Sequence, residues 1–427
     1  MTVELISVGT EILLGNIVNT NANYLSVKCA ELGFSLYYQV SVGDNAGRLG
    51  EVIRSALGRA DILILTGGLG PTQDDLTKET VAGVLGRELI PDEHSRQRIL
   101  NYFNRVQYGD DKSNPAASGL QKITENNWKQ ALKIDNCIVV DNNNGTAPGY
   151  IVEEGEKRIL LLPGPPSEMI PMFEQGMLPY LKKLHNKVFE SRMVKVCGIG
   201  ESKAETMLLD LIKGQDNPTL APYAKSGEVH FRVTASAPVR EKAQELLQPM
   251  IEELYRRFGD SIYTIEEEVT LEAVVVRLLR EQGMTLTTAE SCTGGLLSGK
   301  IVNVPGASEV FTEGFITYSN QAKIKYLGVS GSTLEQFGAV SEQTAGEMAA
   351  GAARTSGCDV SAAITGIAGP EGGTKEKPVG LVYIACHIKG TTTVKEYRLR
   401  GNRDKIREQS VIYALDLIRR CLQKNHR

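Results

Sequence analysis

Three clusters of small and polar residues in the C-terminal part of the chain have the residue types of a nucleophile and its base. The first, residues 290–295 (ESCTGG), follows a predicted strand at 284–289 and precedes a predicted helix at 296–302. A helix start carries unpaired N–H groups that attract developing negative charge. Ser291 stands where the strand passes into the helix, which makes its hydroxyl a candidate nucleophile. The alternative is a serine that caps the helix in a tight turn. Cys292 is expected to be a small buried residue rather than a reactive thiol.

The second cluster, residues 317–323 (TYSNQAK), follows an apolar run at 310–316 that predicts a strand. A serine nucleophile needs a base, and a lysine or tyrosine of lowered pKa can take the place of histidine. Tyr318 and Lys323 are therefore the candidate pair, with Lys325 close by as the alternative to Lys323. None of the five histidines lies in either cluster, which argues against a Ser-His-Asp triad.

The third cluster, residues 365–370 (TGIAGP), follows a predicted buried strand at 360–364. Small residues after a strand let a ligand approach the backbone closely. The alternative is an ordinary glycine–proline turn. We expect the three clusters to supply the substrate contacts of this half of the chain, from Thr293, Gly294, Gly295, Ser319, Asn320, Thr365, Gly366 and Gly369.

A glycine-rich turn in the N-terminal part of the chain has the residue types of a phosphate site. A near-continuous apolar strand is predicted at 61–65, and it ends on residues 66–77 (TGGLGPTQDDLT) before a predicted helix at 78–85. Glycines admit a phosphate to the backbone, and the helix start adds a favourable dipole. The expected contacts come from Gly67, Gly68, Gly70 and Thr72.

Carboxylates accompany this turn. Asp74 and Asp75 offer the hard oxygen ligands that suit Mg²⁺ held between protein and phosphate. Glu11, Asp44 and Asp75 each follow a different predicted strand, and an open α/β sheet brings such strand ends to one edge. The alternative is a structural turn with a solvated pair of aspartates.

The elements predicted around these residues belong to α/β domains. Strands at 3–8, 34–42 and 61–65 alternate with helices at 21–32 and 45–57, which is a doubly wound pattern. A small α+β unit is predicted between residues 194 and 264. In the last part of the chain, a helix at 342–355 carries the apolar stripe Ala345, Met348, Ala349 and Ala352, which predicts a core or subunit contact.

Composition sets further bounds. The 427 residues suggest two to four domains, and a net charge of −4 gives no global attraction to nucleic acid or acidic membranes. Seven scattered cysteines argue against a disulfide framework and favour a reducing cytoplasm. The first residues do not resemble a signal peptide, and no run approaches the ~20 apolar residues of a membrane span. We therefore expect a cytoplasmic protein that does not enter the membrane.

The motifs AESCTGG, TYSNQAK, TGIAGP and PVGLVY, in this order, resemble the C-terminal domain of the CinA (competence/damage-inducible) family. The resemblance covers roughly residues 266–427. It implies a nicotinamide mononucleotide deamidase that releases ammonia, needs no cofactor, and has Ser291, Tyr318 and Lys323 as catalytic residues. The N–H groups of the 293–295 turn are the candidate donors to the oxyanion. Whether Ser291 forms an acyl-enzyme or orients a water stays open.

The motifs SVGTEILLGNIVNTN, VGDN, TGGLGPTQDDLT, NGTAPG and LLPGPPSEM resemble the N-terminal domain of the same family. The glycine-rich turn is also similar to that of the molybdopterin-binding MoaB/MogA proteins. The resemblance implies an ADP-ribose pyrophosphatase that depends on a divalent metal, Mg²⁺ or Co²⁺, with metal roles for Asp44, Asp74 and Asp75. A KH-like linker would join the two enzymes. The linker lacks the GxxG loop of nucleic-acid-binding KH domains, so a spacer or dimerisation module is preferred.

With the resemblance, the sequence predicts an α/β protein of three domains. These are a molybdopterin-binding-like doubly wound domain at 1–175, a KH-like α+β linker at 176–265 and a C-terminal α/β deamidase domain at 266–427. The predicted function is a bifunctional hydrolase of nicotinamide mononucleotide and ADP-ribose, assembled as a homodimer, with no nucleic-acid partner. Two alternatives stay open: a competence-linked binding or regulatory protein, and a molybdopterin-handling enzyme.

Overall fold

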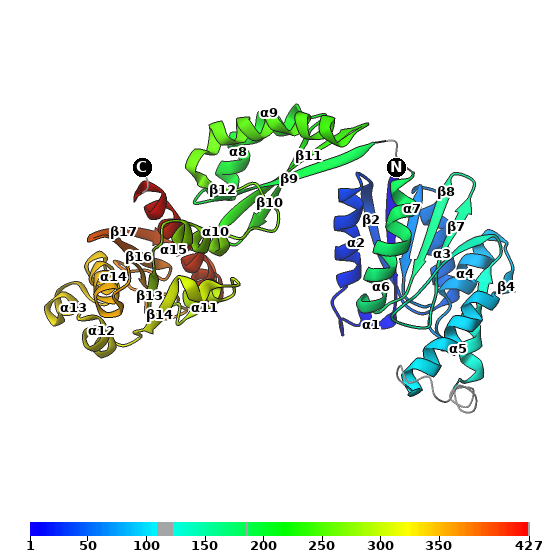
Figure 1. Ribbon diagram of the computed structural model, residues 1–427, viewed down its shortest axis with the longest axis horizontal. Helices are drawn as coiled ribbons and strands as arrows, with labels where there is room; N and C mark the ends of the chain where they lie inside the picture. Colours follow the sequence, from blue (N-terminus) through cyan, green and yellow to red (C-terminus); the bar gives the residue numbers. More distant parts are fainter. Residues whose placement is uncertain (109–122, 185–186, 426–427) are drawn as a thin grey trace. The chain divides into compact units, whose positions relative to one another are not determined.

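The computed structural model describes residues 1–108, 123–184 and 187–425 (Figure 1). By its internal contacts the chain divides into two compact units, residues 1–189 with 236–240 and residues 190–235 with 241–427. Each unit has hydrophobic cores of its own. Among the described residues, no helix has the length and apolar character that crossing a membrane requires.

The first unit is built on a six-stranded sheet with the order β2-β1-β3-β8-β7-β6. Its parallel strands are β1 (Thr2–Val8), β2 (Ser35–Val42), β3 (Ile62–Thr66) and β8 (Lys157–Leu162); β7 (Gly149–Glu154) and β6 (Cys137–Val140) run antiparallel. A separate pair joins β4 (Leu89–Pro91) to β5 (Leu132–Ile134). The helices are α1 (Thr10–Leu13), α2 (Thr20–Glu31), α3 (Ala46–Leu57), α4 (Thr77–Leu85), α5 (Glu93–Tyr108), η2 (Glu125–Ala131), α6 (Pro166–Met172), η3 (Phe173–Met177) and α7 (Leu178–Lys182).

Strand β3 has a hydrophobic core on each side. Ile62 and Ile64 pack in the core under α2, whereas Leu63 and Leu65 pack in the core under α3. All four side chains are fully buried, as expected of a parallel strand covered by helices on both faces. The doubly wound fold predicted for this unit is confirmed.

The linker part of the second unit holds a four-stranded sheet with the order β10-β11-β9-β12. Its strands are β9 (Val188–Cys197), β10 (Thr219–Lys225), β11 (Glu228–Ala237) and β12 (Ile262–Thr264), with helices α8 (Glu201–Lys213), α9 (Arg240–Phe258) and η4 (Gly259–Ser261). The sequence patterns missed β10, because this edge strand is largely exposed and contains Pro222, so it shows no apolar alternation.

The C-terminal part of the second unit holds a five-stranded sheet with the order β14-β13-β15-β16-β17. The strands β13 (Leu286–Glu290), β14 (Phe311–Ile316) and β15 (Val360–Gly366) are parallel, whereas β16 (Leu381–Ile388) and β17 (Thr391–Arg398) are antiparallel. The helices are α10 (Leu271–Glu281), α11 (Leu296–Val302), η5 (Ala307–Glu309), α12 (Asn320–Leu327), α13 (Gly331–Phe337), α14 (Glu342–Ser356) and α15 (Arg403–Asn425).

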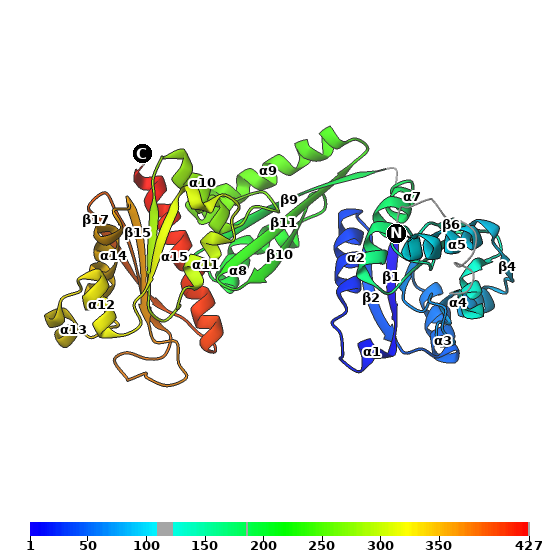
Figure 2. The same ribbon diagram turned by 60° about the horizontal axis from the view of Figure 1, so that its bottom comes forward.

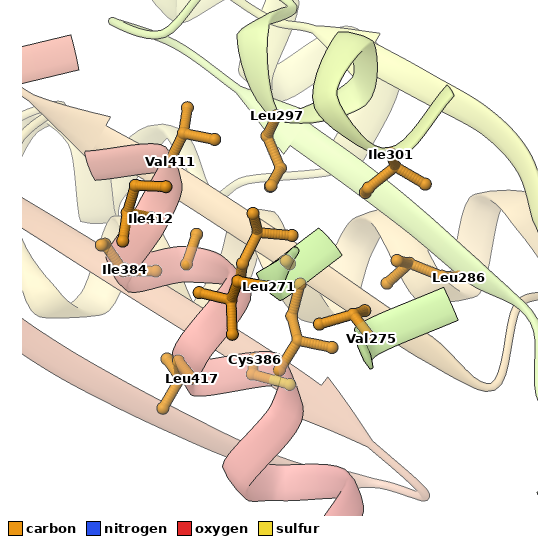
Figure 3. Close-up of a cluster of buried hydrophobic side chains, with 14 of the residues drawn as sticks. Leu271, Val275, Leu286, Leu297, Ile301, Ile384, Cys386, Val411, Ile412 and Leu417 are labelled. Atoms are coloured by element: carbon orange, nitrogen blue, oxygen red, sulfur yellow. The ribbon is translucent and has the colours of Figure 1, made fainter. Parts of the chain in front are cut away.

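Helices α14 and α15 lie on opposite faces of this sheet (Figure 2). The larger core joins α10, α11 and α15 to the sheet through Leu271, Val275, Leu286, Leu297, Ile301, Ile384, Cys386, Val411, Ile412 and Leu417 (Figure 3). On the other face, small residues of α14 let this helix approach α12 closely. A Cβ added at Gly351 would lie 1.9 Å from the carbonyl oxygen of Leu327, the last residue of α12. The apolar stripe of residues 345–352 is buried in this core, so the core interpretation is confirmed.

The three-part α/β architecture predicted from the sequence is therefore confirmed. The predicted boundaries at residues 175 and 265 stay predictions, although Met177 and Leu181 pack in a core of the first unit. The three polar clusters follow the carboxyl ends of β13, β14 and β15, which meet at one edge of the C-terminal sheet. In open α/β sheets this edge is where ligands bind.

Candidate active site

Ser291 and Lys323 form a buried pair at this edge. Ser291 directly follows β13, and its N–H donates to the Ile364 carbonyl at 3.0 Å, which ties it to the end of β15. The Lys323 Nζ lies 3.2 Å from Ser291 Oγ and also donates to the carbonyl oxygens of Thr317 at 2.8 Å and Tyr318 at 3.2 Å. These three partners match the three donors of an ammonium group.

Burial lowers the pKa of Lys323 from its ordinary value to about 8. The side chain is fully buried, and burial disfavours the charged form of an amine. At neutral pH about one Lys323 side chain in ten is then an uncharged amine. An uncharged amine against a serine hydroxyl can accept its proton, which is the chemistry of a serine nucleophile with a lysine base.

Helix α12 sets the position of this lysine. Ser319 caps the helix by accepting the Ala322 N–H at 3.1 Å, and Leu327, one turn beyond Lys323, is buried on the same face. Lys325 points outward instead, with its Nζ 4.8 Å from the centre of the Tyr326 ring. The structure therefore brings Lys323 rather than Lys325 to Ser291.

Tyr318 contributes its backbone to the pair. Its carbonyl accepts a hydrogen bond from Lys323, but its side chain is 66% exposed. Within the described parts of the chain its hydroxyl makes no hydrogen bond. A proton-transfer role for that hydroxyl stays a prediction, as do the substrate contacts predicted for Ser319 and the exposed Asn320.

The side chain of Glu290, the last residue of β13, reaches the start of helix α11. Its fully buried carboxylate accepts hydrogen bonds from the N–H groups of Gly295 at 2.9 Å, Leu297 at 3.1 Å and Ser298 at 2.8 Å, and from the Ser298 hydroxyl at 2.7 Å. The expectation that the Gly295 N–H is free for an oxyanion is therefore wrong, because the chain supplies its own anion there.

Other N–H groups of the same turn stay available. Among the described residues, no hydrogen bond to another residue uses the N–H groups of Cys292, Thr293 and Gly294. The buried hydroxyls of Thr293 and Thr317 also lack a described partner. Burial raises the pKa of Cys292 to about 11, so its thiol is protonated at neutral pH, as expected of a small buried residue.

Replacing Glu290 with glutamine is expected to lower the free energy of unfolding by about 2–4 kcal/mol. The amide keeps one acceptor oxygen but turns an N–H₂ group toward backbone donors that then lose their partner. Urea denaturation measures the change. Glu309→Gln is the control, because Glu309 is exposed and pairs only with Arg280 in the described structure. Equal stabilities for the two variants would contradict a structural role for the Glu290 charge.

Two arginines on the first turns of α15 hold the loops of the site. Arg407 donates from Nε to the Cys292 carbonyl at 3.0 Å and from Nη2 to the Thr293 carbonyl at 2.9 Å. Arg403 donates to the Gly369 carbonyl at 2.8 Å. Sequence reasoning missed both residues, and the only signal was their spacing of four at a helix start, which places them on one face.

The third cluster is explained largely by packing. The Thr365 hydroxyl donates to the Ala339 carbonyl at 2.7 Å. A Cβ added at Gly366 would lie 2.7 Å from a Val382 methyl carbon, and one at Gly369 would lie 2.7 Å from a Val379 methyl carbon. These contacts account for the residue types, and the substrate contacts predicted here stay predictions.

The N-terminal candidate residues line a pocket of about 450 Å³. It gathers every residue predicted there, namely Glu11, Asp44, Gly67, Gly68, Gly70, Thr72, Asp74 and Asp75. Asp44 accepts from the Thr10 N–H and hydroxyl at 2.9 and 2.8 Å, and Asp75 accepts from the Thr72 hydroxyl at 2.5 Å. The carboxylates of Asp44 and Asp75 are thus held in place on the pocket wall.

The donor set of this pocket fits a hard divalent cation in its chemistry. However, the described residues contain no group of three or more His, Cys, Asp or Glu side chains placed to hold a metal by themselves. A bound ion would need further oxygens from phosphate and water, which is how Mg²⁺ is commonly held.

Backbone geometry explains the glycines of the pocket. Gly67 and Gly68 have φ of 97° and 65°, a region that favours glycine. A Cβ at Gly70 would lie 2.4 Å from the Asp75 carboxylate. Gln130 is a pocket residue that sequence reasoning missed, and its buried Oε1 has no partner within the described structure. The only signal in the sequence is its place two residues after Trp128, the single tryptophan of the chain.

Lys78 forms hydrogen bonds to η2 and to the strand β5 that follows it. Its Nζ donates to the carbonyls of Lys129 and Leu132, each at 2.7 Å. Burial lowers the pKa of Lys78 to about 8. Lys129 in turn donates to the carbonyls of Thr72 and Asp75, so η2 is linked to the glycine-rich turn.

Comparisons with known proteins cover nearly the whole chain. Residues 4–183 match the "Probable molybdopterin binding domain" family, residues 191–264 the "Damage-inducible protein CinA KH domain" family and residues 268–422 the "CinA C-terminal domain" family. A "CinA-like protein" of Kosmotoga olearia is 51% identical over 423 residues, which is 99% of each chain. One of Dictyoglomus turgidum is 50% identical over 422 residues, again 99% of each.

Solved structures are similar over parts of the chain. The competence/damage inducible protein CihA of Agrobacterium tumefaciens is 43% identical, covers 36% of this chain and 93% of its own, and has a TM-score of 0.35. The protein CinA of Thermoplasma acidophilum is 32% identical, covers 42% of this chain and 99% of its own, and has a TM-score of 0.37.

Proposed function

The chain belongs to the CinA family, and on that premise we propose that its C-terminal domain hydrolyses the carboxamide of nicotinamide mononucleotide to nicotinate mononucleotide and ammonia. The observation that carries the proposal is the buried contact between Lys323 Nζ and Ser291 Oγ, with the lysine pKa lowered to about 8. The test is ammonia release from nicotinamide mononucleotide by the full chain and by Ser291→Ala.

In the proposed mechanism, uncharged Lys323 accepts the hydroxyl proton as Ser291 Oγ attacks the amide carbon. The N–H groups of Cys292, Thr293 and Gly294 are the available donors to the resulting oxyanion. Lys323 returns the proton to the nitrogen, ammonia leaves and an ester of Ser291 remains. Water then attacks the ester carbonyl, Lys323 accepts the water proton, and the proton returns to Ser291 as the acid departs.

The environment of the pair suits this sequence of proton transfers. Helix α15 holds the oxyanion turn through Arg407, so the donors are fixed before substrate arrives. Tyr318 lies at the exposed edge of the site, and its hydroxyl is proposed to turn toward the leaving nitrogen and assist the proton transfer. The predicted contacts of Thr293, Ser319, Asn320 and Gly366 would then surround the substrate, and the reaction requires no cofactor.

For the N-terminal domain we propose cleavage of the ADP-ribose pyrophosphate with a divalent metal, Mg²⁺ or Co²⁺. Asp44, Asp74 and Asp75 would hold the ion, and the glycine-rich turn would receive the phosphates. When bound, the ion supplies Lewis-acid polarisation of a phosphoryl oxygen. The proposal is supported by the pocket that gathers these residues and by the unpartnered Gln130 oxygen inside it.

Asp75→Asn is expected to lower metal-dependent release of AMP from ADP-ribose by about a hundredfold, the scale seen when groups at a metal site are lost. The change removes a charge from the pocket and weakens the hold on Thr72. Chromatography of AMP, with Mg²⁺ and with Co²⁺, measures the rate. Asp135→Asn, an exposed aspartate outside the pocket, is the matched control. Undiminished AMP release by Asp75→Asn would contradict the metal role.

One alternative for the first domain has a specific observation in its favour. The match of residues 4–183 to a molybdopterin-binding family keeps a molybdopterin-handling function open. Molybdopterin that copurifies with the protein would favour it, and AMP release from ADP-ribose would displace it.

A regulatory role tied to competence rests on the names of relatives, such as a competence-damage inducible protein of Alkaliphilus oremlandii that is 48% identical over 98% of each chain. DNA binding at physiological salt would favour it.

We also propose that the protein is a cytoplasmic homodimer. The cytoplasmic location comes from the scattered cysteines, and the dimer comes from the family resemblance rather than from a described contact between copies. The apolar stripe of α14, the other ground for a dimer, is buried in the core. Size-exclusion chromatography with light scattering tests it. A particle with the 46.5 kDa mass of one chain would contradict the dimer.

A further inference from the structure

A second cavity, of about 600 Å³, lies within the second unit where the C-terminal part of α15 meets the linker. Its walls come from strand β17, helix α15 and the linker residues Gly198, Asp260 and Ser261. Arg407, which braces the Ser291 turn, is thirteen residues from Arg420 in the cavity wall, or roughly 20 Å along the helix. The cavity is therefore separate from the candidate active site, and its volume is that of a small-molecule site.

Two stacked tyrosines form one wall of this cavity. The rings of Tyr397 on β17 and Tyr413 on α15 lie 4.8 Å apart with an angle of 7° between their planes. Burial raises the pKa of both phenols, so both hydroxyls are neutral donors at physiological pH. Paired aromatic rings at a cavity wall offer a surface on which a planar ring can stack.

The charges of the cavity favour an anion. Lys395 and Lys424 line it and make no hydrogen bond or ion pair with any described residue. Asp416 is already neutralised, since its carboxylate accepts from Arg419 at 2.6 Å and from Arg420 at 2.7 Å. Asp260, which is acidic, also lines the cavity, and its charge interacts with that of Arg420. Both lysines also face the Cys421 thiol in the same wall, whose pKa is lowered by its contact with Cys386 and by the two lysine charges. No carboxylate of the described chain pairs with either lysine.

Hydrogen bonds join α15 to the linker beside the cavity. Arg419 is fully buried and donates to the Asp260 carbonyl at 2.7 Å, which ties α15 to the linker. Arg420 reaches the Ser261 hydroxyl at 3.3 Å. A site fixed in this way loses little conformational freedom when a ligand binds.

We propose that this cavity binds a nucleoside monophosphate. The base would stack on the Tyr397 and Tyr413 wall, and Lys395 and Lys424 would receive the phosphate. Ser261 and Thr393 also line the cavity, and their hydroxyls would be available to the ribose. Because both the linker and the C-terminal domain contribute residues, the ligand would bind the two parts together. The inference does not depend on the proposed hydrolase function.

Isothermal titration calorimetry of the full chain with AMP tests this site. We expect the double variant K395E/K424E to bind AMP at least tenfold more weakly at this site than the unmodified chain. The matched control is K203E/K213E, which reverses two exposed lysines of α8 without touching the cavity. The control separates loss of the site from a general effect of charge.

Two further arms identify which part of the nucleotide is recognised. Tyr397→Leu is expected to weaken AMP several-fold and to leave competition by inorganic phosphate unchanged, because it removes only the stacking surface. Adenosine, which lacks the phosphate, is expected to bind the unmodified chain and K395E/K424E equally weakly. Thermal unfolding midpoints of the variants establish that each is folded.

The proposal is overturned if the unmodified chain does not bind AMP, or if AMP binds K395E/K424E and the unmodified chain with the same affinity. The second outcome would place AMP in another site, such as the N-terminal pocket. Inorganic phosphate that binds this site as tightly as AMP does would show a site for any anion, and this result would also overturn the proposal. The experiment measures the binding of AMP, so its result stays valid even if the protein does not hydrolyse the amide.

Discussion

Replacing Ser291 with alanine is expected to lower kcat for ammonia release from nicotinamide mononucleotide by about ten-thousand-fold or more, the scale seen when a serine nucleophile is removed. The change deletes the attacking oxygen and leaves Lys323 with its two carbonyl partners. Substrate binding should persist, because the turn that follows Ser291 is held by Arg407 from α15. Ammonia and nicotinate mononucleotide are measured together, with nicotinamide riboside as the substrate control.

The neighbouring thiol provides a matched control. Cys292→Ala is expected to stay within about threefold of the unmodified protein, because a buried thiol with a pKa near 11 is a poor nucleophile at neutral pH. Loss of activity in Cys292→Ala with full activity in Ser291→Ala would transfer the nucleophile to the thiol and contradict the proposal. Equal activity in all three proteins would exclude both residues as nucleophiles.

Lys323→Met is expected to lower kcat about a thousandfold, within the range for general bases. Methionine keeps similar length and volume but cannot accept a proton. In the unmodified protein the rate should rise as pH increases through about 8, because the uncharged amine is the active form. Activity remaining in Lys323→Met should lack this rise. Lys325→Met, on the exposed face of the same helix, should keep both the rate and the pH profile.

The same substitution has a consequence for stability. The pKa of Lys323 is lowered from 10.5 in the unfolded chain to about 8 in the folded one, so the unfolded state binds the proton more tightly. Stability therefore rises with pH between about 8 and 10.5, and below pH 8 the buried charge costs about 3 kcal/mol. Relative to Lys323→Met, the unmodified protein should gain about that amount between pH 7 and 10.5. Urea denaturation at both pH values measures it, and a constant difference would contradict the lowered pKa.

Much of the fold follows from local patterns. The continuous apolar run of β3 reports a strand buried on both faces, and Ile62–Leu65 alternate between two cores as such a strand must. The helical spacing of Lys323 and Leu327 also predicts that Lys323 is the lysine that faces inward, because residues four apart share a face. Lys325 lies off that face.

Other features of the site needed the three-dimensional structure. Glu290 ends a strand, and no pattern indicates that its carboxylate turns back onto the start of the next helix. Arg403 and Arg407 lie more than a hundred residues after the turn that Arg407 holds. Contacts between segments so far apart in sequence depend on how the sheet and α15 pack, and residue types alone do not specify them.

The central claim is covalent catalysis by Ser291 with Lys323 as its base. Intact-mass spectrometry of protein quenched in acid at millisecond intervals during turnover of nicotinamide mononucleotide tests it most directly. The account predicts a population heavier by the mass of the substrate less ammonia, with the added mass on the peptide that contains Ser291 and no such population in Ser291→Ala. Unmodified protein at every quench time, together with continued turnover by Ser291→Ala, would contradict it.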